Sequence, residues 1–192
     1  MVRPDPGDAA PLPRPFYDRP TARVARELLG ARLARRMEAG WRLARIVETE
    51  AYVGSDPASH AYRGETPRNR SMFLAPGTLY VYRIHQVHCA NVTTRRGQAV
   101  LLRAAEPLSP DLGDLRGPGR LCRGFGLTRR DDGCDLVTGT VRLLPRVGPR
   151  LTAIAAPRVG IRKATDRMLR FAVRGNPWVS SPRPWGRAGR GA

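Results

Sequence analysis

The chain has no apolar run close to the roughly 20 residues that a membrane-spanning helix needs. Its first residues, MVRPDPGDAAPLPRPF, also lack the apolar stretch that follows the charges of a secretory signal. A hydrophobic fraction of 41% is nevertheless compatible with a folded, soluble protein. We therefore expect no membrane span and, by default, a cytoplasmic location, at the nucleoid if the source is prokaryotic.

Cysteine and histidine are scarce, which limits metal and disulfide chemistry. The three cysteines, Cys89, Cys122 and Cys134, form no CxxC pair and are odd in number, so neither a zinc cage nor a full disulfide framework is indicated. His85 and His88 are three positions apart but follow a strand pattern, and no HExxH or H-x-E with P-C-x-x-C motif is present. The sequence therefore predicts no metal and no cofactor, and it argues against deaminase chemistry.

Lysine is almost absent, although the chain is strongly basic. Lys163 is the only lysine among 34 lysine and arginine residues, and the formal net charge is +18 with a pI near 11.5. A charge of this size favours a polyanionic partner such as nucleic acid, because neutralised phosphates release counterions. Genome-wide codon bias toward arginine would give the same composition, so charge alone does not decide between the two explanations.

The length and composition predict one domain with loose ends. A chain of 192 residues is long enough for one ordinary core and too short for two. Both ends are rich in proline and small residues. We expect a flexible lead-in over residues 1–14, a single domain over residues 15–180 and a disordered basic tail over residues 181–192.

The hydrophobic pattern predicts many strands and few helices. A helix is expected over residues 21–30, a hairpin over residues 31–53 that turns at 38–40, and a short helix after Thr66 and Pro67. Further strands are expected at residues 78–84, 98–106, 141–145 and 169–175, and no internal repeat is present. This pattern is typical of an α+β fold: a single domain with a curved, mostly antiparallel sheet and a few short helices.

The stretch VETEAYV, residues 47–53, places two acids on the second strand of that hairpin. A period of two puts one set of side chains on one face (Ile46, Glu48, Glu50 and Tyr52) and another set on the opposite face (Val47, Thr49 and Ala51). On this pattern alone, two solvated charges on an exposed strand face explain the acids better than catalysis does. Periodicity does not rank Glu48 against Glu50.

Several strings together resemble the alkyladenine (3-methyladenine) DNA glycosylase family, the metal-free type without a helix-hairpin-helix. They follow one another in the family's order from about residue 15 to about residue 180: RIVETEAY, a histidine ten residues after Glu50, TPRNRSMF, PGTLYVY, CANV, VLLRAAEPL, GPGRLC, RVGI and FAVRGNPWVS. The resemblance implies a DNA repair enzyme of base excision. Such an enzyme flips an alkylated purine out of duplex DNA and hydrolyses its N-glycosidic bond, leaving an abasic site. The implied substrates are 3-methyladenine and 7-methylguanine, with hypoxanthine as a further candidate.

The resemblance also implies catalytic roles. Glu50 matches the family's water-activating acid, which acts as general base and counter-charge. Arg103 matches the arginine beside the nucleophilic water and the phosphate. Val159 matches a residue whose backbone carbonyl helps to hold that water. Glu48 is left as a supporting acid.

Four further matches imply a base-binding pocket. Tyr52 and Tyr82 match aromatic walls that stack on the purine, and a methylated purine carries positive charge that such walls attract. His60 matches the pocket histidine, and Asn91 matches the asparagine that crowds the exocyclic amino group of ordinary guanine. Each has a plainer alternative: tyrosines often pack, a loop histidine is often incidental, and Asn91 suits a turn. Arg103 suits a surface ion pair. The family resemblance decides against these alternatives, and for Val159 it is the only argument.

The sequence departs from the family's pattern at two places. The family's intercalating tyrosine, which fills the space left by the flipped base, is replaced in YRIHQVHCAN, where one residue is also missing. His85 falls at the position of this wedge, with His88 and Val87 as alternatives. The connection at residues 108–116 is also shorter than the family's. Basic residues gather around and after it, and we expect some of them to contact phosphate: Arg116, Arg120, Arg123, Arg129 and Arg130.

The sole lysine bears on the reaction type. A glycosylase that also cuts the DNA backbone needs an amine, and Lys163 is far in sequence from the VETEAYV strand. The sequence therefore predicts a monofunctional hydrolase, without lyase activity, acting as a monomer on double-stranded DNA. The main alternative is a non-catalytic nucleic-acid-binding relative with impaired base flipping, and a third is an RNA binder selected by charge alone.

Overall fold

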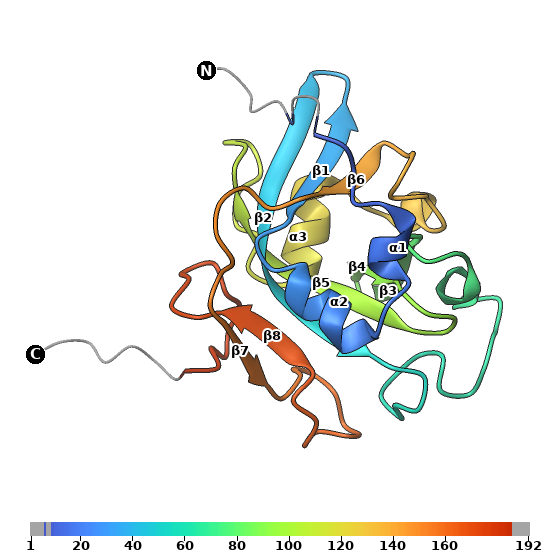
Figure 1. Ribbon diagram of the computed structural model, residues 1–192. Helices are drawn as coiled ribbons and strands as arrows, with labels where there is room; N and C mark the ends of the chain where they lie inside the picture. Colours follow the sequence, from blue (N-terminus) through green and yellow to red (C-terminus); the bar gives the residue numbers. More distant parts are fainter. Residues whose placement is uncertain (1–5, 7–8, 186–192) are drawn as a thin grey trace, which may run out of the picture.

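The computed structural model describes Pro6 and residues 9–185. In this part of the chain an antiparallel sheet is accompanied by short helices (Figure 1). The strands are β1 (Arg32–Met37), β2 (Gly40–Tyr52), β3 (Leu79–Ile84), β4 (Val87–Thr93), β5 (Ala99–Pro107), β6 (Val141–Leu144), β7 (Ala153–Ala156) and β8 (Arg170–Val173). The α-helices are α1 (Arg14–Tyr17), α2 (Thr21–Glu27) and α3 (Pro118–Phe125), and the 3-10 helices are η1 (Arg70–Phe73) and η2 (Arg129–Asp131).

Strand β2 is the centre of the sheet. The strand order is β3-β4-β5-β2-β1-β6, and β8 pairs with both β2 and β7. Every pairing is antiparallel, and the sheet curls around the core as a half-barrel (Figure 1). The predicted α+β fold with a curved, mostly antiparallel sheet is confirmed.

The hairpin of β1 and β2 forms where the sequence predicted it. Met37 pairs with Gly40, whose φ of 110° lies in the region that glycine adopts without strain. Apolar residues of β2 then enter the main core with helix α2, and the Thr49 hydroxyl donates to the Ala25 carbonyl at 2.8 Å. This packing fixes β2 against α2 and turns its two acids to the other side.

Two irregularities interrupt the pairing of β2 with β5 beside the acids. Ile46 pairs with Ala105 and Glu48 pairs with Ala104, so Val47 is an extra residue of β2 that has no partner on β5. Thr49 then pairs with Leu102, which leaves Arg103 as the extra residue of β5. Bulges of this kind redirect a side chain, and here Arg103 reaches both acids. The strict alternation expected from Ile46 onward is wrong at this point, because Ile46 and Val47 both belong to the core.

The structure adds elements that the sequence pattern did not predict. Strand β4 follows β3 after a two-residue turn, β7 pairs with β8, and helix α3 contacts β4 and β5. The short helix expected after Thr66 begins later, as the 3-10 helix η1 from Arg70. Before it, the backbone amide and the hydroxyl of Thr66 both donate to Asn69 Oδ1. No helix of the described chain is long and apolar enough to cross a membrane.

The described ends of the chain pack on the domain. The Leu12 amide donates to the Leu143 carbonyl at 2.7 Å and its side chain is buried, so contacts with the core begin inside the segment expected as a lead-in. Near the other end, Trp185 packs against the core and the Pro182 carbonyl accepts from Arg170 at 2.8 Å. The rest of the expected lead-in and tail, residues 1–5, 7–8 and 186–192, lies outside the described residues.

Candidate active site

A cavity of about 400 Å³ opens where β2, β3, β4 and β5 meet two loops and the start of α3. This volume is within the range of small-molecule sites. Its lining residues include most of those predicted for the site and several others: Tyr52, Pro57, Ala58, His60, Met72, Tyr80, Tyr82, Ile84, Cys89, Asn91, Ala99, Leu101, Arg103, Pro118, Val159, Gly160, Ile161, Arg162 and Lys163. The fold therefore brings together segments that are more than 100 residues apart in the chain.

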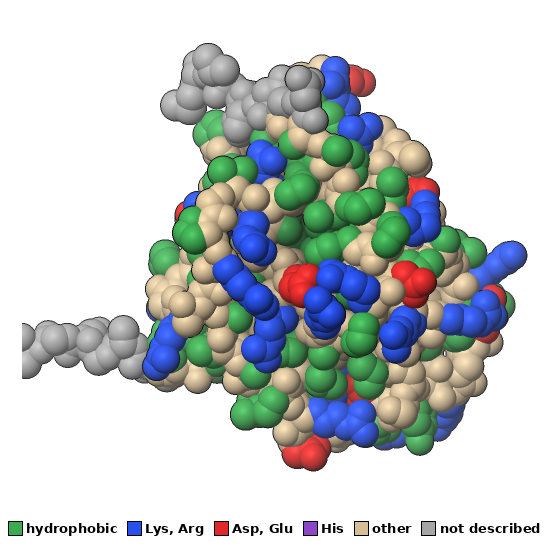
Figure 2. All heavy atoms as spheres, in the orientation of Figure 1, with side chains coloured by type: hydrophobic (Ala, Val, Ile, Leu, Met, Phe, Trp, Pro, Cys, Tyr) green, Lys and Arg blue, Asp and Glu red, His purple; other side chains and the backbone are tan. Residues whose placement is uncertain are grey.

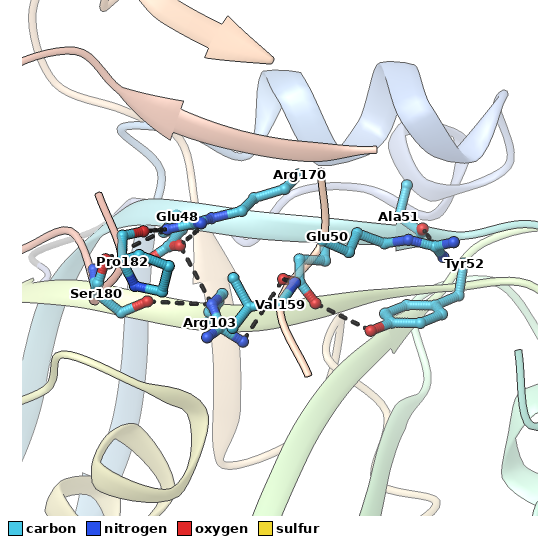
Figure 3. Close-up of polar contacts among 10 residues, drawn as sticks. Glu48, Glu50, Ala51, Tyr52, Arg103, Val159, Arg170, Ser180 and Pro182 are labelled. Atoms are coloured by element: carbon cyan, nitrogen blue, oxygen red, sulfur yellow. Dashed lines mark hydrogen bonds and ion pairs between the residues drawn. The ribbon is translucent and has the colours of Figure 1, made fainter. Parts of the chain in front are cut away.

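Glu50 is bonded to residues that line this cavity, and Figure 3 shows these contacts. The Val159 amide donates to its Oε1 at 2.9 Å, and the Tyr52 hydroxyl donates to its Oε2 at 2.9 Å. A guanidinium nitrogen of Arg103 is 3.5 Å from Oε1. These partners line the cavity, whereas Glu50 itself has 0% of its surface exposed and is not among the lining residues. The three partners therefore lie between the Glu50 carboxylate and the cavity.

Glu48 is equally buried but points to a different set of groups. Arg170 donates to its Oε1 at 2.6 Å, the Ser180 amide donates to its Oε2 at 2.7 Å, and Arg103 Nε is 3.2 Å from Oε1. Arg170 and Ser180 do not line the cavity. Glu48 and Glu50 were expected to share one strand face, but they have different surroundings (Figure 3). Glu50 is held by residues of the cavity, whereas Glu48 binds Arg103 and the segment after β8.

Aromatic rings form one wall of the cavity. The rings of His60 and Tyr82 meet edge to face with centroids 4.4 Å apart, and those of Tyr80 and Tyr82 are 5.5 Å apart. His60 Nδ1 and the Tyr80 hydroxyl are 3.0 Å apart. Burial, with the Glu50 carboxylate adding to it, raises the pKa of the Tyr52 hydroxyl, and burial likewise raises the pKa of Tyr80 and Tyr82. These phenols are neutral at pH 7.

The ring of His60 contacts Tyr82, although the residue as a whole is exposed at the cavity. Partial desolvation of the imidazole lowers its pKa from the ordinary value and so favours the neutral form. A neutral imidazole does not repel a cationic ligand, whereas a protonated one would. The aromatic wall therefore offers stacking surface to a cation without an opposing charge.

Asn91 is fixed by its own strand neighbourhood. The side chain is buried, and its amide nitrogen donates to the carbonyls of Tyr80 at 3.1 Å and Cys89 at 3.3 Å. Both amide hydrogens are thereby used, and this settles the orientation of the amide. Asn91 is a rigid part of the cavity wall.

The turn between β3 and β4 reaches the mouth of the cavity. Ile84 and Val87 pair across the end of the hairpin and are 46% and 37% exposed, and Ile84 lines the cavity. His85 occupies the turn with φ 51° and does not line the cavity. His88 pairs with Arg83 further back along the hairpin. The apolar side chain that the tip presents toward the cavity is Ile84.

A second hollow of about 520 Å³ shares the wall formed by His60, Tyr80 and Tyr82. Its other lining residues are Thr66, Arg68, Asn69, Arg83 and Arg129. Arg68 and Arg83 are exposed, and within the described chain neither has an acidic partner. Figure 2 shows blue basic side chains spread over one face of the molecule, some of them beside red acidic side chains.

Of the basic residues expected to contact phosphate, three are paired with an acid, and one of these is Arg129, 3.5 Å from Asp132. Arg116 and Arg120 form ion pairs with Asp114 at 2.9 Å and 2.7 Å, and the Arg116 guanidinium lowers the pKa of Asp114 to about 2. Arg129 lines the second hollow and donates to the Val81 carbonyl at 2.8 Å. The structure therefore places one of the five, Arg129, beside the cavity wall.

Lys163 lies at the cavity, although it is far in sequence from the strand that carries Glu50. The 159–163 segment lines the cavity, and Lys163 is an exposed residue of its rim. Lys163 is far from the VETEAYV strand in sequence, but its segment lies beside that strand in space, because Val159 on the same segment is bonded to Glu50. The described chain contains no group of three or more His, Cys, Asp or Glu side chains that could hold a metal ion.

Sequence reasoning missed four residues around the acids: Asp56, Arg158, Arg170 and Ser180. Arg158 and Asp56 form a buried ion pair, and Arg170 is separated from Glu48 by 122 positions. The one available signal for Arg158 was its place directly before Val159 in RVGI. Arg170 opens an apolar strand, a position that gives no indication of a buried acid opposite it.

Comparison with known proteins agrees with this geometry. A sequence model of the methylpurine-DNA glycosylases matches residues 15–177, and the chain belongs to this family. A protein of Anaeromyxobacter dehalogenans strain 2CP-1 is 46% identical over 188 residues, covering 93% of this chain and 90% of its own. Proteins of Rhodopirellula baltica and Methanocella arvoryzae are 42% and 43% identical, covering 91% and 90% of this chain and 84% and 97% of their own. Each of the three carries the name "Putative 3-methyladenine DNA glycosylase".

The resemblance seen in the sequence is therefore confirmed. Membership of the family supports DNA glycosylase activity on alkylated bases, with DNA as the substrate.

Proposed function

We propose that the protein excises alkylated purines from double-stranded DNA by hydrolysing the N-glycosidic bond with a water activated by Glu50. The observation that carries this proposal is the position of Glu50. Its carboxylate is bonded to Tyr52 and Val159 and lies 3.5 Å from Arg103, and all three residues line the same aromatic cavity. A merely solvated strand acid would be exposed, and Glu50 is not.

The cavity suits a flipped, positively charged purine. Extrusion of a base costs a few kcal/mol, and least for a damaged base. Tyr52 and Tyr82 supply aromatic faces, the phenols are neutral, and the lowered pKa of His60 favours its uncharged form. The implied bases are 3-methyladenine and 7-methylguanine, with hypoxanthine as a neutral candidate. Rigid Asn91 is proposed to crowd the exocyclic amino group of undamaged guanine.

Hydrolysis requires a base and charge stabilisation at the sugar. As the glycosidic bond breaks, the sugar gains oxocarbenium character, which the Glu50 carboxylate stabilises while it takes a proton from water. Arg103 is proposed to orient the water and the adjacent phosphate from its bulge on β5. Val159 contributes its amide to Glu50, and we propose that its carbonyl holds the water.

The first test is direct release of free bases. The wild-type protein, as a monomer, should release 3-methyladenine and 7-methylguanine from duplex DNA in single-turnover assays. The competing function is a nucleic-acid binder without efficient flipping. Binding to lesion-containing duplex without any base release would establish that alternative.

The hairpin tip is proposed to fill the space left by the flipped base. The sequence predicted His85 as this wedge. Ile84 is a second candidate, because its exposed apolar side chain lies at the cavity mouth. Ile84→Ala should lower the single-turnover rate about tenfold, since it removes most of the apolar area that replaces the base. His85→Ala is the matched control, and its effect should be smaller. A larger loss in His85→Ala would return the wedge role to His85.

The basic hollow is proposed to contact DNA phosphates. Replacing Arg68 and Arg83 together by Gln should reduce the slope of log affinity against log salt by about 2. Replacing Arg116 and Arg120 by Gln is the matched control, because Asp114 already neutralises part of their charge. Equal slopes for the two double variants would remove the special role of the hollow.

The reaction is proposed to be hydrolysis without strand cleavage. Glu50 provides a route through water, and Lys163 is an exposed residue on the rim. We expect no covalent adduct when borohydride is added during turnover, and the same rate for Lys163→Gln as for the wild type. An adduct that disappears in Lys163→Gln would instead show that Lys163 forms a Schiff base.

A further inference from the structure

A buried ion pair between Arg158 and Asp56 adjoins the Glu50 site without lining the cavity. Both side chains have 0% exposed surface. Arg158 donates to both carboxylate oxygens of Asp56, with one of these distances at 3.1 Å. Isolated buried charges are costly, and here each charge of the pair compensates the other.

The Arg158 guanidinium joins three separate segments. It donates to the Ala51 carbonyl at 3.1 Å, on β2 between Glu50 and Tyr52. Through Asp56 it holds the segment that follows β2, where the Ala58 amide also donates to the carboxylate at 3.0 Å. The third segment is its own loop, where the Ala164 carbonyl accepts from it at 3.5 Å. The loop that carries Val159 is thus tied to the strand that carries Glu50.

Arg158 also supports the aromatic wall from behind. Its guanidinium carbon is 4.7 Å from the centroid of the Tyr52 ring, and Tyr52 faces the cavity while Arg158 does not. Arg158 Nε is buried and has no hydrogen-bond partner among the described residues. The ring is therefore held on one side by a fixed cation.

We propose that Arg158 is a positioning residue that keeps the Val159 amide on Glu50 and the Tyr52 ring in the cavity wall. The reason is that Arg158 directly precedes Val159, so the anchor and the donor are one peptide unit apart. A displacement of about 1 Å at a reacting group costs about 10²-fold in rate. This inference rests on the proposed hydrolysis at Glu50, since a binding protein would not need a fixed carboxylate.

The test compares Arg158→Lys with a matched pair elsewhere. Arg35 on β1 donates to both oxygens of Asp131 at 2.9 Å and 3.4 Å, outside the site, so Arg35→Lys is the control. Lysine keeps the charge but loses the planar fork. Arg158→Lys should lower the single-turnover rate by about 10 to 10²-fold while the affinity for duplex with a tetrahydrofuran abasic analogue stays unchanged. Arg35→Lys should change neither.

A second measurement is independent of activity. The Val159 amide should be protected from hydrogen exchange in the wild type and exchange faster in Arg158→Lys, whereas Arg35→Lys should leave it protected. If Arg158→Lys does not fold, the double variant Asp56→Asn with Arg158→Met leaves no unpaired buried charge and should show the same pattern. An unprotected Val159 amide in the wild type, or an unchanged rate in the variant, would overturn the proposal. A wild type that releases no base would refute the proposed function instead.

Discussion

Glu50→Gln is expected to reduce base release by about 10² to 10⁴-fold, the usual contribution of a general base. The amide oxygen of Gln can still accept from the Val159 amide, and its NH2 group can donate to the Tyr52 hydroxyl oxygen, so the cavity should retain its shape. It loses the ability to accept a proton from water and the charge that stabilises an oxocarbenium-like sugar. The single-turnover rate on duplex DNA containing 3-methyladenine, 7-methylguanine or hypoxanthine measures this effect.

The control for this experiment is Glu106→Gln. Glu106 lies on β5, is partly exposed and pairs with Arg45 at 3.1 Å, away from the cavity. Its replacement should leave the rate unchanged, since exposed ion pairs contribute little. If the wild type releases no more base than Glu50→Gln, the enzymatic proposal fails.

Glu48→Gln is expected to act mainly on stability. Glu48 forms a buried ion pair with Arg170, and it also pairs with Arg103, which contacts Glu50 as well. Loss of one partner of a buried ion pair costs about 3 to 5 kcal/mol, a large part of the roughly 5 to 15 kcal/mol that stabilises a domain. The free energy of unfolding from a denaturant titration should fall by this amount, while the rate per folded molecule falls less than in Glu50→Gln.

A compensating variant sharpens the comparison. Adding Arg170→Met to Glu48→Gln removes one unpaired guanidinium and should recover part of the lost stability. An unchanged denaturation midpoint in Glu48→Gln would contradict the structural role. Equal losses of activity in Glu48→Gln and Glu50→Gln would show that the two acids work as a unit through Arg103.

Local signals explain which parts of the fold the sequence predicted. The β1–β2 hairpin follows from period two and Gly40, and helix α2 from the apolar spacing before Gly30. Strand β4 carries Ala90 and Asn91, residue types that are depleted in strands, and it is held by pairing with β3 and β5. Helix α3 begins in the glycine-rich GPGRLC, where propensity argues against a helix and contacts with β4 and β5 favour one.

Residues of the candidate site were predictable only where the sequence around them matched a string typical of the family. Tyr52, Tyr82 and Asn91 were found through family strings, and the structure brings all three to one cavity. The division of labour between Glu48 and Glu50 was not predictable from the strand pattern, because the Ser180 amide that binds Glu48 is 132 positions away. The bulge that places Arg103 between the acids is a property of pairing register, which one strand alone does not encode.

The single lysine offers a use beyond the reaction itself. Apart from the N-terminal amine, Lys163 is the chain's only primary amine, and it sits on the cavity rim. An amine-reactive fluorophore would therefore attach to one side chain, without mutagenesis, beside the entrance that a flipped base must pass. Its emission would report the arrival and departure of the base in real time, separately from bond cleavage.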